Sequence, residues 1–93
     1  MHAQEMEPAM QQLQASMRTM DHCMQDAMIG GGDFARSFAQ MMIAHHEGAM
    51  EMPRIALQRV QNPRMYQMLD KTIEENQHDA QDLRAWLTLA ASQ

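Results

Sequence analysis

The sequence predicts an all-α fold, a small antiparallel helical bundle of three main helices in a single domain, residues 1–93. Apolar residues recur in steps of four and three along two long segments, the spacing of helices that bury one stripe. No segment shows the strict alternation of apolar and polar residues that is typical of a strand. Helix-breaking residues divide the chain twice, at Gly30-Gly31-Gly32 and at Asn62-Pro63.

The first helix is expected at approximately residues 6–28, because three glycines follow it. Its apolar positions alternate in steps of four and three, as they do in the seam of a left-handed helical bundle. The predicted seam consists of Met6, Met10, Leu13, Met17, Met20, Met24 and Ala27.

The second helix is expected at residues 34–60, with Asp33 as its capping residue. Pro53 lies inside this segment, where it removes one backbone hydrogen bond and clashes with the carbonyl of Ala49, so we expect a kink or short break near it. The stripe that faces the core includes a histidine, and a polar side chain at a core position needs an explanation. The stripe consists of Phe34, Phe38, Met41, His45, Gly48, Met52 and Ile55.

The third helix is expected at residues 63–91, because Asn62 supplies a cap and Pro63 suits the first helical turn. Its seam repeats the steps of four and three, with Asn76 as the one polar position, where it would set the register. A chain of 93 residues builds a modest core, and dimerisation is one way to complete a four-helix bundle. The seam consists of Leu69, Ile73, Asn76, Ala80, Leu83, Leu87 and Ala90.

Composition and charge favour a cation as the ligand. The chain has 12 acidic and 7 basic residues, and this net charge of −5 disfavours nucleic acid or an anionic membrane as the main partner. No apolar run approaches the roughly 20 residues that span a bilayer, and the first residues lack the basic and apolar regions of an export signal. We therefore expect a soluble chain without a membrane span.

Methionine is abundant in this chain, whereas aromatic residues and cysteine are scarce. There are 13 Met, 4 aromatic residues and one cysteine, Cys23, which has no partner for an intramolecular disulfide. Methionine fills irregular cores, and its thioether also coordinates soft metals without deprotonation or disulfide formation. A Met-rich, Cys-poor chain therefore favours the periplasm or the cell exterior.

Candidate metal ligands concentrate in the second helix, where residues 41–52 hold four methionines and two adjacent histidines. Thioether and imidazole donors together favour Cu(I) and its analogue Ag(I) over cations that prefer oxygen. Packing explains each residue taken singly, but the density of the cluster favours metal binding. On a helix they form two stripes: Met41, His45 and Met52 toward the core, and Met42, His46 and Met50 toward the surface.

Two methionines of the first helix, Met20 and Met24, are further metal-ligand candidates. They flank a histidine and the cysteine in the run Met20-Asp21-His22-Cys23-Met24, whose composition suggests soft-metal ligands. Heptad spacing alone also explains both methionines as packing residues, and His22 points nearly opposite to them on a helix. The sequence leaves open whether the N-terminal methionines and Cys23 bind metal.

Signatures of catalysis are incomplete, so we expect no catalytic residues and no enzyme. Glu75 and His78 form a single Glu-x-x-His pattern, whereas a di-iron bundle requires two that face inward. His46 and Glu47 begin like the zinc-protease signature, but Met50 stands where the second histidine is required. A metal-dependent enzyme would also need an acid or base, for which Glu47 is the nearest candidate.

The run of residues 33–87 resembles the bacterial "domain of unknown function 305" family. Its motif Met-x-x-His-His-x-x-Ala-x-x-Met falls on Met42, His45, His46, Ala49 and Met52. The resemblance implies a small, ferritin-like helical bundle that is usually exported. It also implies a link to copper, because some members bind copper or silver in the periplasm and support copper resistance.

The residues and the resemblance together predict a copper-binding protein. We expect reversible binding of Cu(I), with Ag(I) as analogue, for copper sequestration, resistance or delivery in copper homeostasis. Its partners would be copper ions, a metal-exchange protein and a second copy in a homodimer, and its location would be periplasmic or extracellular. The alternative is a Met-cored structural or interaction helical dimer without metal.

Overall fold

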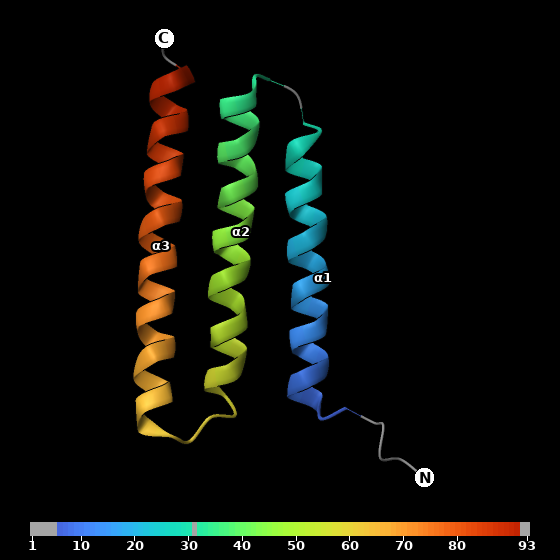
Figure 1. The fold of residues 1–93 in the computed structure, drawn as a ribbon, viewed down its shortest axis with the longest axis vertical. Coiled ribbons are helices and arrows are strands. Elements are labelled where there is room, and N and C mark those ends of the chain that lie inside the picture. Colours follow the sequence, from blue (N-terminus) through green and yellow to red (C-terminus); the bar gives the residue numbers. More distant parts are fainter. Residues whose placement is uncertain (1–5, 31, 92–93) are drawn as a thin grey trace.

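The computed structural model describes residues 6–30 and 32–91. Within them the chain forms three antiparallel helices, α1 (Pro8–Met28), α2 (Phe34–Leu57) and α3 (Pro63–Ala91), and no strand (Figure 1). The predicted all-α fold is confirmed. None of the described helices is long and apolar enough to cross a membrane. The predicted domain also includes residues 1–5, 31 and 92–93, which lie outside the described residues.

Side-chain caps begin two helices where the sequence predicts them. The Asp33 carboxylate accepts a hydrogen bond from the Arg36 backbone N–H at 2.8 Å, and the Asn62 side-chain oxygen accepts one from the Met65 N–H at 2.9 Å. Each bond satisfies a donor that has no backbone partner in the first helical turn. α1 begins slightly later than predicted, at Pro8, because proline fits the first turn of a helix but not its interior.

α2 continues through Pro53 and ends at Leu57, before the predicted end near residue 60. Of the two predicted alternatives, a kink or a short break near Pro53, the break is therefore wrong. A proline inside a helix removes one backbone hydrogen bond, and α2 tolerates this loss because Pro53 is buried and the helix is packed on both sides.

The three helices lie side by side in one layer, with α2 in the middle (Figure 1). α2 packs against α1 on one side and α3 on the other, whereas α1 and α3 do not contact each other within the described residues. The Cα atoms accordingly span 57 × 31 × 12 Å, and the shortest dimension is about one helix thick. The two sides of α2 that face out of the layer are therefore not covered by another described helix.

The seam predicted for α3 agrees with the structure at every position. Its seven residues are the ones in α3 that are buried or half-buried, and every other residue of the helix is exposed. Ala80 has no accessible surface. The steps of four and three identify this stripe because α3 has a single neighbour, so one stripe contains all of its packing.

The seam predicted for α1 is wrong in its first half. Met10 and Met17 are 49% and 55% exposed, whereas Ala9 and Ser16 are half-buried against α2. Small residues at these positions let two helix backbones approach, and the longer methionines lie beside the contact. The half-buried residues of α1 are Ala9, Leu13, Ser16, Met20, Met24 and Ala27.

The two phenylalanines of α2 do not enter a core, contrary to the predicted stripe. Phe34 is 83% exposed and Phe38 is 47% exposed, and their rings stack on each other with centroids 6.1 Å apart. Both rings lie on a side of α2 that faces out of the layer, and no described helix covers this side.

Gly48 is required for the contact between α1 and α2. A Cβ atom at this position would lie 2.7 Å from the Met20 Cβ and would also collide with the end of that side chain. Met20 therefore lies directly on the α2 backbone, in space that any residue larger than glycine would occupy.

Gly48→Ala is expected to lower the free energy of unfolding by about 1 kcal/mol, because overpacking of roughly 1–3 kcal/mol exceeds a helix-propensity gain of about 1 kcal/mol. In a Met20→Gly background, which removes the Cβ of residue 20 as well, the same substitution should become stabilising, because the clash is gone. Urea denaturation of the four proteins measures both effects. Met24→Gly is the matched control background, in which Gly48→Ala should stay destabilising. If Gly48→Ala changed the free energy of unfolding in the same direction with and without the Met20 side chain, the two residues would not be in contact.

Candidate metal centre

The predicted ligands of α2 lie at the middle of the layer, between α1 and α3. The adjacent residues His45 and His46 are half-buried, and their ring planes are at 81° with centroids 5.4 Å apart. Consecutive side chains on a helix diverge by about 100°, so the two histidines face different surroundings. The two stripes predicted from the sequence are thus separate environments.

His46 points toward α3 and is held there by a side-chain hydrogen bond. Its Nδ1 atom lies 2.8 Å from the Oδ1 atom of Asn76. The Nδ2 atom of Asn76 donates to the backbone carbonyl of Thr72 at 2.9 Å. The one polar residue in the α3 seam therefore positions a histidine of α2, a role that the sequence alone did not reveal.

This hydrogen-bond chain defines the tautomer of His46. Because the Asn76 amide group donates to Thr72, its oxygen is the atom that faces His46 and must accept. Nδ1 of His46 consequently carries the proton, and Nε2 has the lone pair. A fixed imidazole with a free Nε2 is the arrangement found in metal-binding histidines.

A surface hollow of about 290 Å³ lies beside His46, between α2 and α3. It brings together Met42 and His46, which the sequence predicts as ligands on one stripe. It also includes two carboxylates, Asp79 and Asp82, which are not among the ligands predicted from the sequence. Each directly precedes a residue of the α3 seam, and this position is the sequence signal that could have identified them. The lining residues are Phe38, Met42, His46, Asp79, Asp82 and Leu83.

His45 has a polar atom that the protein does not satisfy. Its Nδ1 atom is buried and has no hydrogen-bond partner among the described residues. Buried polar atoms are nearly always paired, so an unpaired imidazole nitrogen needs an explanation, such as an ion that binds there.

A second hollow, of about 310 Å³, contains Met41 and lies between α2 and the end of α1. It adds Met28 to the thioethers near the candidate centre, a residue that sequence reasoning missed. Phe38 lines this hollow and the one beside His46, so the two hollows adjoin on the same face of α2. The lining residues are Met28, Phe34, Ser37, Phe38 and Met41.

The remaining candidate methionines lie along the helix contacts. Met20 of α1 rests on Gly48, one helical turn after His45, and Met24 is half-buried on the same side of α1. Met50 and Met52 are half-buried on α2, but they line neither of the two hollows. The structure thus brings Met20 to the His45 region and Met42 to His46.

The His22 and Cys23 side chains lie away from this centre. His22 Nε2 is 3.3 Å from the Asp26 carboxylate, one turn along α1, and Cys23 is exposed. Neither joins Met20 and Met24 in one site, as the helix geometry predicts.

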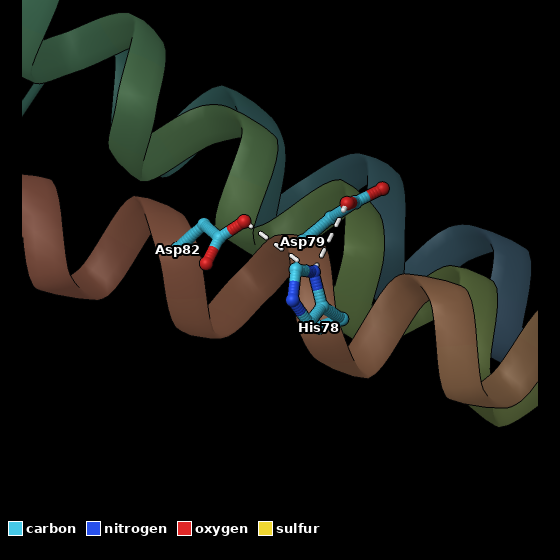
Figure 2. A group of neighbouring side chains, drawn as sticks. All are labelled: His78, Asp79 and Asp82. Carbon is cyan, nitrogen blue, oxygen red and sulfur yellow. Dashed lines mark ion pairs between the residues drawn. The ribbon is translucent and has the colours of Figure 1, made fainter.

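A different cluster on α3 consists of His78, Asp79 and Asp82 (Figure 2). His78 Nδ1 lies 3.4 Å from Asp82 Oδ2 and 4.0 Å from Asp79 Oδ1, and all three side chains are exposed. These nitrogen and oxygen donors suit harder cations such as Zn²⁺ better than Cu(I). Ion pairs between neighbours on one helix also account for the cluster without a metal.

Comparison with known proteins places the chain in a family. A search of curated proteins finds no match. A family model described as "Domain of unknown function (DUF305)" matches residues 1–87. This match includes α1 with Met20 and Met24, and is therefore wider than the run of residues 33–87 that carries the resemblance. The chain belongs to the DUF305 family.

Proposed function

We propose that this protein binds Cu(I) reversibly, with Ag(I) as an analogue, for copper sequestration, resistance or delivery. The unpaired Nδ1 atom of His45, buried in a Met-rich part of the chain, is the observation that carries the proposal. Leaving a buried polar atom unpaired costs about 1–3 kcal/mol, and a soft cation bound to it would remove that cost. Thioethers beside it would complete a coordination shell suited to a soft ion.

The first proposed site centres on His45. Its thioether ligands come from Met41 and Met52 on α2, and from α1 through Met20, which rests one turn away on Gly48. Met24 follows Met20 by one turn on the same side of α1. These donors are neutral, so the site would bind a monovalent ion without releasing protons from the thioethers.

The second proposed site centres on His46 and opens to the surface hollow. Met42 lines this hollow with His46, and Met50 follows His46 by one turn on α2. Asp79 and Asp82 give the hollow a negative potential that attracts a cation. This more accessible site would exchange copper with a protein partner.

The remaining parts of the proposal concern location and chemistry. The resemblance to exported copper-binding proteins and the Met-rich composition support a periplasmic or extracellular location. Glu47, the acid or base candidate nearest to the histidines in the sequence, forms a salt bridge with Arg84 of α3. We therefore assign the protein a binding role and no enzymatic activity.

His45→Leu is expected to lower Cu(I) affinity at least about tenfold, or to remove one bound ion, because it replaces a donor by an apolar group of similar size. Native mass spectrometry of an anaerobic Cu(I) titration with a competing chelator measures this, with Zn²⁺ in parallel. His78→Leu is the matched control and should retain full Cu(I) binding. Loss of Cu(I) binding in His78→Leu but not in His45→Leu would instead assign the metal to the exposed cluster on α3.

Ag(I) is expected to raise the thermal unfolding temperature, because it binds the folded chain and not the unfolded one. At 100 times the dissociation constant, the stabilisation would be about 2.7 kcal/mol. Circular dichroism melts with and without Ag(I) detect it. Unchanged melting would instead favour the Met-cored structural dimer without metal.

Asn76→Ala is expected to lower the free energy of unfolding by about 1 kcal/mol and Cu(I) affinity roughly tenfold, because His46 loses the acceptor that fixes its tautomer. Asn76→Asp keeps an acceptor and should retain the tautomer, while Gln77→Ala, an exposed neighbour, is the control. Nitrogen-detected NMR of the histidine rings reports the tautomer directly. An unchanged His46 tautomer in Asn76→Ala would contradict this role.

A further inference from the structure

The two faces of α2 differ sharply in charge. At about 100° per residue, all four charged residues of α2 fall within an arc of roughly 60°. The opposite arc, which also lies between α1 and α3, has no Asp, Glu, Lys or Arg. The charged arc holds Arg36, Glu47, Glu51 and Arg54, and the opposite arc holds Phe34, Phe38, Met41, Met42, His45, Ala49, Met52 and Ala56.

α1 continues this asymmetry across the layer. Its methionines at positions 10, 17, 24 and 28 share an arc of about 40° on the helix. Met28 lines a hollow with Phe34 and Phe38, so this arc is on the uncharged side of α2. On the other side, Gln12 and Thr19 of α1 line a hollow with Glu51. We call the side with Phe38 and the methionines the Met/Phe face.

α3 completes the Met/Phe face with an apolar part and an acidic edge. Leu83 lines the hollow with Phe38, and Trp86, which follows by three residues, is 43% exposed. Asp79 and Asp82 line the same hollow, and both belong to α3, which forms one side of the layer. The acidic groups are therefore displaced from the middle of the face, where His45 lies.

The chain as a whole exposes more surface than a compact monomer of its mass, as expected of a chain that buries one face on association. The accessible surface of the chain is 6895 Å², whereas a compact monomer of 10.7 kDa has about 5,500 Å². The surplus of about 1,400 Å² exceeds the roughly 800 Å² that each partner buries in a typical stable complex. The only buried residues among those described are Ala39, Pro53, Ile55 and Ala80, so the layer has almost no core of its own.

We infer that a second copy of this chain covers the Met/Phe face, so that two three-helix layers form a six-helix assembly. The layer is 31 Å wide, whereas one helix is about 10–12 Å across, so a single partner helix would leave much of the face open. A second layer matches the full width. A two-fold axis pairs the face with itself, and the uncharged middle avoids repulsion between two chains that each carry a net charge of −5.

This inference replaces the expected four-helix bundle by a two-layer assembly, and it rests on packing alone. It holds for the metal-free protein, so its failure would leave the Cu(I) proposal intact. Because His45 is near the midpoint of α2, both copies would place this residue in the shared interior.

Sedimentation velocity of the metal-free full chain tests the inference. We expect the mass of two chains at micromolar concentration. Phe38→Glu should weaken the dimer at least about 30-fold, the size of an interface hot spot, because it buries a charge. Gln40→Glu places the same charge on the opposite side of α2 and should leave the dimer unchanged.

If Phe38→Glu loses helicity, Met17→Glu provides the same test on another helix. Met17 belongs to the same face and is 55% exposed. This variant should also give a monomer. A monomeric wild-type chain would overturn the inference. So would a dimer that survives both Phe38→Glu and Met17→Glu, or one that Gln40→Glu disrupts.

Discussion

The position of α2 between its two neighbours is the constraint on which the rest of the structure depends. Small residues make that position possible, because Gly48 admits Met20 from one side and Ala80 of α3 is buried without any accessible surface. With both flanks occupied, α2 stays helical through Pro53. The same arrangement leaves Phe38 on an uncovered side and separates the surroundings of the two histidines.

Sequence spacing predicted the contact stripe of α3 but only part of that of α1, although each of these helices packs against α2 alone. In α3 the apolar spacing identified every inward position, and Asn62 marked its start. In α1 the same reasoning chose Met17 over Ser16, because apolar character does not indicate how closely two backbones approach. The single-layer arrangement could not be predicted, since it depends on which helices meet.

The candidate site was predictable from the sequence only within α2. Helical spacing placed Met42 beside His46 on one stripe, and the structure has both in one hollow. The roles of Asn76 and Asp79 depend on the register between α2 and α3, which no pattern within a single helix determines. The missing hydrogen-bond partner of His45 is likewise a property of three-dimensional surroundings.

Two neighbouring histidines with different surroundings have a consequence for the kinetics of metal transfer. The ring centroids are 5.4 Å apart, yet His46 borders a hollow that carboxylates of α3 also line, while His45 has a nitrogen sealed from solvent. If the protein binds Cu(I) as proposed, an ion that enters at His46 would move to His45 by exchanging one ligand at a time, without separation of the helices. Loading rate and retention time would then depend on different residues, so evolution could adjust either one without changing the other.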